Sequence, residues 1–161
     1  MSVDLQALAA RRDDAGARNQ LEDRVHRIVR RYCRARIGRS GHGFGTADEL
    51  ADNLARTILR ERQDEFGGRV PAEAIVYSGM APVVARVLDD HPVPPQPQAR
   101  GPVSPEHVHD QLGRLPPRYR EVLVLRVFVG MTSEQAGRAL GLTPEAVLQE
   151  QRRALIRLRE L

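Results

Sequence analysis

Six prolines fall within the fifteen residues from His91 to Pro105, and no regular helix or central strand can run through such a segment. Proline fixes one backbone angle and lacks the amide hydrogen that helices and sheets use. The segment therefore predicts a semi-extended linker over residues 91–105 that divides the chain into two parts. With 161 residues in total, each part is the size of a small domain.

The amino-acid composition favours helices on both sides of that segment. Hydrophobic residues make up 41% of the chain, which is enough to form a core, but aromatic residues make up only 4% and tryptophan is absent. The cores must therefore consist mostly of Leu, Val, Ile and Ala, which favours small helical units. We expect an all-α protein: a tail over residues 1–20, then helical domains over residues 21–90 and 106–161 joined by the Pro-rich linker.

Charge is spread unevenly along the chain. The formal net charge is +4, and all 25 basic residues are Arg. Both ends are basic, whereas residues 41–110 are acidic. A modest positive balance permits a nucleic-acid partner without requiring one. No apolar signal core and no run of about 18 apolar residues is present, so we expect a soluble cytoplasmic protein with no membrane partner.

Two helices are expected in the first half of the N-terminal part. Residues 1–20 are polar after a short apolar stretch and predict a frayed helix or a tail. Apolar residues then recur at helical spacing from Leu21 to Ile37, with Arg on the opposite face. A Gly-rich loop is expected over residues 38–45. Thr46 and Glu49 fit the N-cap and N3 positions of a capping box, so a second helix should begin there.

A third helix is expected from Pro71, because apolar residues continue at helical spacing as far as Leu88. Gly79 and Pro82 lie inside this stretch. Since proline removes a backbone donor and clashes with the preceding turn, we expect this helix to be kinked or broken.

Two capped helices end the chain. Thr132 and Gln135 fit a second capping box, and Gly141 is placed to end the helix that follows. Thr143 fits the N-cap of a last helix, with Pro144 at its first position. Two short helices around a glycine turn have the dimensions of a helix-turn-helix.

The segment Glu121–Val129 is ambiguous by pattern. Pro116 and Pro117 favour the start of a helix just before it, whereas its many β-branched residues also fit a buried strand. Pattern alone leaves both structures open.

A helix-turn-helix places the first residues of its second helix against DNA bases, while arginines hold the phosphates. We expect a buried stripe of Val147, Ala154, Leu158 and Leu161, with Leu155 beside it, and an outward face opposite. The alternative is an ordinary helical hairpin whose arginines are only solvated. If the motif binds DNA, the candidate contact residues are Arg138, Thr143, Glu145, Ala146, Leu148, Gln149, Arg152 and Arg153.

One stretch of the C-terminal part has a specific resemblance. The run from Leu115 to Arg126 (LPPRYREVLVLR), with Gly130, Ala136 and the later pairs Leu140-Gly141 and Leu158-Arg159, resembles region 4 of the extracytoplasmic-function (ECF) sigma factors of bacteria. In that family region 4 is a four-helix helix-turn-helix domain that binds the −35 promoter element. The resemblance therefore implies that the ambiguous segment is a helix.

The N-terminal part carries a second resemblance. Residues 31–38 (RYCRARIG), 47–51 (ADELA) and 75–81 (IVYSGMA) are similar to region 2 of actinobacterial ECF factors, those of the sigma factor D type especially. Together the two resemblances imply that the partners are core RNA polymerase and promoter DNA, with an anti-sigma factor as a further candidate and no cofactor. The polymerase-binding residues implied are Arg31, Arg34, Asp48, Glu49, Asp52 and Asn53.

Three departures from the family pattern leave an alternative open. Asp52 and Asn53 stand where the family usually has Gln and Glu. Residues 81–90 carry one Arg and two acids where the promoter-melting helix of the family is basic, so phosphates would be repelled. Leu148 stands where a basic residue is usual. The alternative is a degenerate sigma homologue that acts as a protein-interaction or regulatory module without opening promoters. A helix-turn-helix regulator of another family is a third, weaker interpretation.

The remaining polar residues form no recognisable catalytic or metal-binding pattern. The five His residues are scattered; His107 and His109 are poorly spaced for one helix face, and no Cys supports them. Asp89 and Asp90 are better interpreted as a solvated helix end than as catalytic carboxylates. Cys33 is better interpreted as a small buried hydrophobe than as a reactive thiol. We therefore expect no metal, no cofactor and no enzymatic activity.

Overall fold

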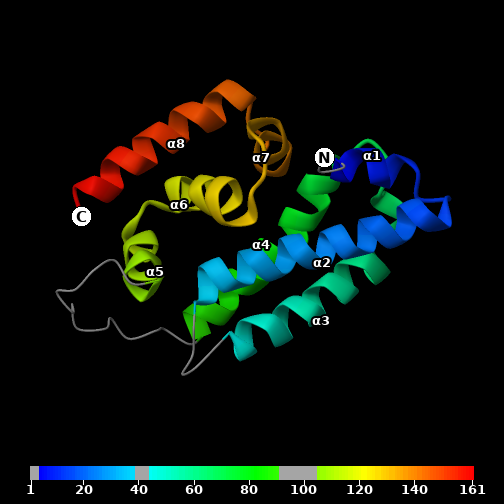
Figure 1. Cartoon of the computed structure of the whole chain (residues 1–161), viewed down its shortest axis with the longest axis horizontal. Helices are drawn as coiled ribbons and strands as arrows, with labels where there is room; N and C mark the ends of the chain where they lie inside the picture. Colours follow the sequence, from blue (N-terminus) through cyan, green and yellow to red (C-terminus); the bar gives the residue numbers. More distant parts are fainter. Residues whose placement is uncertain (1–3, 39–43, 91–104) are drawn as a thin grey trace.

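The computed structural model describes residues 4–38, 44–90 and 105–161, and every regular element within these ranges is helical. The all-α prediction is confirmed. In Figure 1, α5 to α8 lie on one side of the long helix α2, and α3 lies on the other. The elements are α1 (Leu5–Ala10), α2 (Ala15–Ile37), α3 (Gly45–Glu61), η1 (Gln63–Glu65), α4 (Ala72–Asp90), α5 (Pro105–Arg114), α6 (Pro117–Leu123), η2 (Val124–Val129), α7 (Ser133–Leu140) and α8 (Pro144–Arg159).

Of the frayed helix or tail predicted for residues 1–20, the structure shows helix over most of residues 4–20. Asp4 caps α1, and Leu5 and Leu8 are buried in the core. Gln6 accepts a hydrogen bond from the amide of Ala72 at 2.7 Å, so α1 also caps the start of α4. Helix α2 begins six residues earlier than predicted, because Asp14 caps it. The apolar stretch in α1 is too short to show a helical period in the sequence.

The start of α3 also differs from the prediction. The helix begins at Gly45 with Phe44 at its N-cap, and Thr46 lies inside the first turn instead of capping it. Phe44 packs against the core, and the guanidinium of Arg34 lies 5.0 Å from the centre of its ring. These contacts of Phe44 fix the position at which the chain enters the helix. Most of the predicted loop before it, residues 39–43, lies outside the described residues.

Helix α4 is continuous through Gly79 and Pro82, so the predicted break is not found. A Cβ atom at Gly79 would lie 2.7 Å from Cγ1 of Ile58, so glycine lets α3 and α4 cross closely. Pro82 is exposed, on the side of the helix away from the core. A missing backbone donor is tolerated there because the freed carbonyl can be hydrated.

Cys33, on α2, is buried in the core. Burial raises the pKa of its thiol to about 12, so the thiol stays protonated near neutral pH. Its role as a small buried hydrophobe is what the sequence favoured.

The ambiguous segment Glu121–Val129 is helical. It forms the end of α6 and then the π-helical turn η2, in which Val124 and Leu125 are fully buried. The helix implied by the resemblance is therefore confirmed. Gly130, with φ of +81°, ends the turn, and the amide of Met131 donates to the carbonyl of Leu125 at 2.9 Å.

Both predicted caps of the helix-turn-helix are confirmed. The amide of Gln135 donates to the hydroxyl of Thr132, and the amide of Thr132 donates to the side chain of Gln135. Gly141 ends α7 in the left-handed conformation, with φ of +68°. The hydroxyl of Thr143 accepts from the amide of Ala146 and begins α8.

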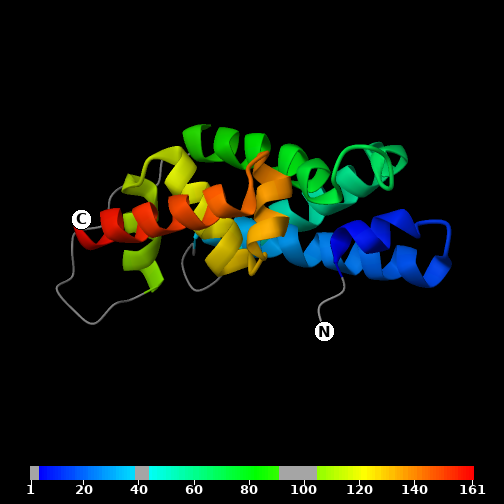
Figure 2. The ribbon, with the colours of Figure 1, turned by 90° about the horizontal axis from the view of Figure 1, so that it is seen from above.

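The two halves of the chain are packed together. Helix α7 lies against α4, and η2 lies against α2, as Figure 2 shows from above. The predicted boundary in the linker falls mainly on residues 91–104, outside the described residues, and the division into two domains stays a prediction. None of the described helices is long and apolar enough to cross a membrane.

Candidate nucleic-acid and protein interfaces

Helix α8 presents an outward face at its N-terminal end. Val147 and Ala154 hold its inner face in the core, and Leu158 packs at the edge. The predicted buried stripe is wrong in its last member, because α8 ends at Arg159 and Leu161 is 48% exposed. Leu155 is also exposed instead of joining the stripe.

Most of the candidate DNA-contact residues share that outward face. Leu148 is 38% exposed, as the helical spacing predicted. Arg152 has no ion-pair partner among the residues that the structure describes, whereas Arg153 lies 3.8 Å from Glu150. The other members on α8 and its cap are exposed or half-buried: Thr143, Glu145, Ala146 and Gln149. The arrangement can offer side chains and a helix N-terminus to a DNA groove.

Arg138 is not on this face. It projects from α7 toward the N-terminal part, where its Nη2 lies 2.8 Å from Oε1 of Glu73 and 3.0 Å from Oδ1 of Asp4. Its Nε also donates to Glu73, and these hydrogen bonds raise the pKa of Arg138. Glu73 is only 1% exposed. In this arrangement the guanidinium holds carboxylates of the other half of the chain, and a phosphate contact by Arg138 stays a prediction.

The candidate polymerase-binding residues lie on α2 and α3, and two of them, Arg34 and Asp48, are paired with each other. Arg34 holds both carboxylate oxygens of Asp48 at 2.7 Å, which lowers the pKa of Asp48. Asp52 accepts from Arg30 at 2.9 Å, whereas Glu49 and Asn53 on α3 are exposed. Arg31 points elsewhere, and its Nη1 donates to the carbonyl oxygen of Val129 at 3.1 Å.

A polar network between the two halves was not predicted from the sequence. Glu121 of α6 is paired with Arg36 and accepts hydrogen bonds from the hydroxyls of Tyr32 at 2.7 Å and Tyr77 at 3.1 Å. The rings of Tyr32 and Tyr77 meet edge to face, with centroids 6.3 Å apart. Burial, together with the charge of Glu121, raises the pKa of both tyrosines. The sequence hinted at this network only through the position of Glu121, a carboxylate at the start of an apolar run.

The scattered histidines form no metal site in the part of the chain that the structure describes. Within the described ranges no group of three or more His, Cys, Asp or Glu side chains could hold an ion. His109 instead places Nδ1 3.1 Å from the carbonyl oxygen of Ala35, which joins α5 to the end of α2.

Comparison with known proteins adds to this geometry. The family described as Sigma-70, region 4 matches residues 106–158, which make up most of α5 to α8. The ECF RNA polymerase sigma factor ShbA of Streptomyces griseus subsp. griseus is 34% identical over 92% of this chain and 88% of its own length. The ECF RNA polymerase sigma factor SigD of Mycobacterium tuberculosis is 33% identical over 91% of this chain and 78% of its own length.

The fold has a match among solved structures as well. The structure of CnrH in complex with the cytosolic domain of CnrY aligns with a TM-score of 0.62, at 24% identity, over 97% of this chain and 93% of that chain. That likeness concerns the fold. The identity with ShbA and SigD over nine-tenths of the chain, with the region 4 match, confirms the resemblance seen in the sequence: this chain belongs to the ECF RNA polymerase sigma factors.

Proposed function

We propose that the chain binds core RNA polymerase and directs promoter-specific transcription initiation, with α8 reading the −35 element. The observation that carries the proposal is the exposed, Thr143-capped start of α8, where Leu148, Gln149 and Arg152 face outward within the region 4 match. The relatives that cover most of the chain are named as RNA polymerase sigma factors, which supports the polymerase as the partner. No enzymatic step and no cofactor is part of the proposal.

An anti-sigma factor is a further partner in this proposal. Its support is that CnrH, which shares the fold, was solved in complex with the cytosolic domain of a second protein.

Binding to the polymerase should depend on the exposed face of α3. Glu49 and Asn53 are exposed and lie one helical turn apart on that face. Placing positive charges at the centre of a protein interface weakens association when the partner surface matches the original charges. We expect the double variant Glu49→Arg with Asn53→Arg to bind core enzyme about tenfold more weakly, measured by fluorescence polarisation of the labelled full chain. Glu160→Arg, at the end of α8, is the control. Equal affinity of the double variant and the unmodified chain would remove α3 from the polymerase interface.

DNA binding should respond in opposite directions to two changes on α8. Leu148→Arg adds a charge to the outward face, so affinity for duplex DNA should rise and the slope of log K against log salt should steepen by about one unit. Arg152→Ala should lower affinity and flatten the slope by about one unit. Titrating labelled duplex DNA with the full chain at several salt concentrations measures both.

The control for this pair is Arg56→Ala, since Arg56 is exposed on α3, away from α8. If neither α8 variant changes the slope, α8 does not meet DNA, and the proposal fails at that step.

A second candidate function is favoured by the surface of α4. We propose, as the alternative, a sigma homologue that binds its partners but opens promoters poorly. From Pro82 to the end of α4, the exposed residues are Pro82, Val83, Arg86, Asp89 and Asp90. One Arg against two Asp gives no net positive charge to hold a displaced strand, and the chain has no Trp to stack on an unpaired base.

Under this alternative, permanganate footprinting of polymerase complexes formed with the chain should show little reactive thymine. A complex formed with an ordinary ECF factor on its own promoter is the positive control. Thymine reactivity equal to that control would contradict the alternative and favour full initiation activity.

A further inference from the structure

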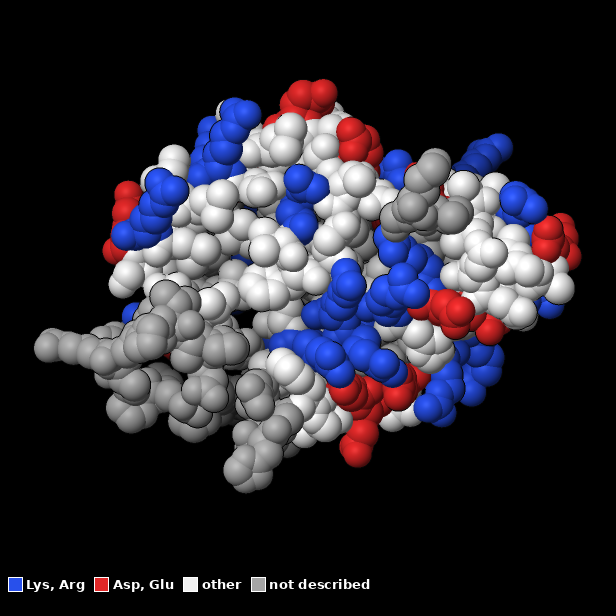
Figure 3. Space-filling view, viewed as in Figure 1, with Lys and Arg blue, Asp and Glu red and all other residues white. Residues whose placement is uncertain are grey.

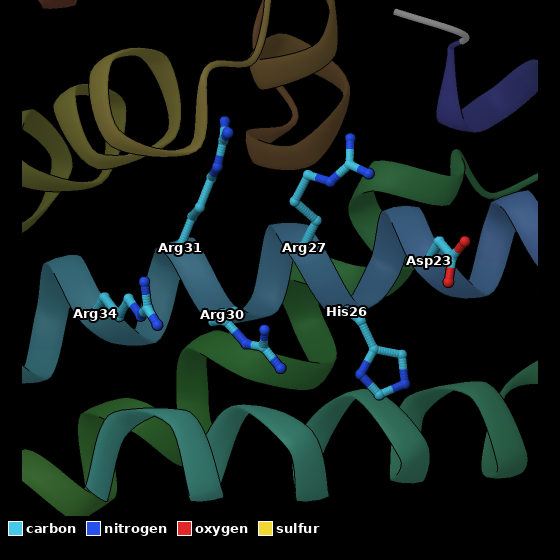
Figure 4. Close-up of a pocket in the computed structure, with 6 residues that line it drawn as sticks. All are labelled: Asp23, His26, Arg27, Arg30, Arg31 and Arg34. Atoms are coloured by element: carbon cyan, nitrogen blue, oxygen red, sulfur yellow. The ribbon is translucent and has the colours of Figure 1, made fainter. Parts of the chain in front are cut away.

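Five arginines in the middle of α2, between Arg24 and Arg34, fall into two rows that differ in their partners. One row faces α3, where Arg30 is paired with Asp52 and Arg34 with Asp48. The other row consists of Arg24, Arg27 and Arg31, which lie three and four residues apart and therefore share a face. Figure 4 shows Arg27 and Arg31 pointing away from α3, toward the C-terminal half, whereas Arg30 and His26 point toward α3.

The second row has no acidic partner. Within residues 4–38, 44–90 and 105–161, none of Arg24, Arg27 and Arg31 forms an ion pair with a carboxylate. Arg31 donates to a backbone carbonyl, and Nε of Arg24 is buried without a hydrogen-bond partner. Burial, and then the charges of Arg27 and Arg31, lower the pKa of Arg24. The charges of Asp4 and Glu73 act on Arg24 in the opposite direction, so Arg27 and Arg31 are the two members best placed to bind an anionic ligand.

Members of both rows, but not Arg24, line an open hollow beside α2. Its volume is about 400 Å³, and its lining residues are Asp23, His26, Arg27, Arg30, Arg31 and Arg34. Figure 3 shows the arginine side chains gathered over α2, where the two halves of the chain meet. The hollow is thus large enough to admit carboxylate side chains from a partner that lies across it.

The contact between α2 and α3 indicates how the acidic residues of a partner would have to be spaced to pair with Arg27 and Arg31. Arg30 and Arg34 are four residues apart, and so are the acids that pair with them, Asp52 and Asp48. A helix with acids one turn apart therefore matches arginines one turn apart on α2. Arg27 and Arg31 repeat the same spacing, and neither is paired with a carboxylate among the described residues.

We propose that Arg27 and Arg31 bind a helix of a partner protein that carries two Asp or Glu residues four positions apart. This goes beyond the proposed function, because it requires neither DNA reading by α8 nor the exposed face of α3. Nucleic acid fits the hollow less well, because Asp23 would repel phosphates and His26, the one lining residue with a ring, points toward α3.

The test uses the full chain and three fluorescein-labelled probes. The first is an alanine-rich helical peptide with glutamates at four-residue spacing. The second has the same composition with the glutamates at two-residue spacing, and the third is a single-stranded oligothymidine of equal charge. Anisotropy titration should give at least threefold tighter binding of the first peptide than of either other probe, because only its acids meet both arginines.

Variants then locate the binding site. Arg27 is exposed and unpaired, so Arg27→Gln keeps the fold, which circular dichroism checks. It should weaken binding of the first peptide about fivefold, as should Arg31→Gln, whereas Arg56→Gln on α3 should change it less than twofold. Arg27→Glu should bind a peptide with lysines at the same spacing more tightly than the unmodified chain does.

Three results would overturn the proposal. Equal binding of the two glutamate peptides would show that spacing is not recognised. Equal weakening by Arg56→Gln and Arg27→Gln would show general charge attraction. Tighter binding of the oligothymidine than of the first peptide would assign the hollow to nucleic acid.

Discussion

Replacing Glu121 by alanine is expected to lower the free energy of unfolding by about 3 kcal/mol, because it leaves Arg36 buried without its carboxylate partner. The side chains of Arg36 and Glu121 are 9% and 12% exposed, so water only partly replaces the lost pair. The hydroxyls of Tyr32 and Tyr77 also lose the oxygen to which they donate. Urea unfolding followed by circular dichroism measures the change.

The matched control is Glu22→Ala. Glu22 is exposed on α2, and its removal should change the free energy of unfolding by less than about 0.5 kcal/mol. If Glu121→Ala unfolds at the same urea concentration as the control, the network does not stabilise the folded chain. Tyr77→Phe removes a single hydroxyl and should give an intermediate loss of about 1 kcal/mol.

The second large effect is expected at Gly137 of α7. A Cβ atom there would lie 2.5 Å from the carbonyl oxygen of Leu142, which is backbone and cannot rotate away. The amide of Leu142 also donates to the carbonyl of Gly137 at 2.9 Å, so the turn between α7 and α8 closes directly onto this glycine. Gly137→Ala should therefore destabilise the fold by about 2 kcal/mol and displace α8, despite the better helix propensity of alanine.

Gly113→Ala is the control for that variant. Gly113 is also within a helix, α5, but a Cβ atom there would have no neighbour within 4 Å. The same change should stabilise the chain by up to about 1 kcal/mol, since alanine favours the helix. Thermal unfolding of both variants should shift in opposite directions. A stabilised Gly137→Ala would mean that the turn can relax at little cost.

The sequence predicted the parts of the fold that depend on neighbouring residues. The capping pair Thr132 and Gln135, the stop at Gly141 and the cap at Thr143 all follow from side chains that bond their own backbone a few residues away. The exposure of Leu148 follows from its position one residue beyond the buried Val147.

Contacts between distant residues left no comparable signal. Arg138 was a reasonable phosphate-binding candidate by its place in the motif, but its carboxylate Glu73 is 65 residues away in the sequence. Thr46 and Glu49 fit a capping box, yet the packing of Phe44 determined where α3 begins. Local propensity is weak compared with such tertiary contacts, and a sequence pattern does not record which distant residue will supply them.

Three polar contacts that hold the halves together join residues far apart along the chain: 85 positions for Arg36 and Glu121, 98 for Arg31 and Val129, and 134 for Asp4 and Arg138. Closing loops of that length costs chain entropy before any contact forms. Individual helices form within about a microsecond, so the docking of α6 and α7 onto α2 and α4 should be the late, rate-limiting event of folding. Since this docking forms last, we expect the contacts between the halves to be among the first to open when the chain unfolds.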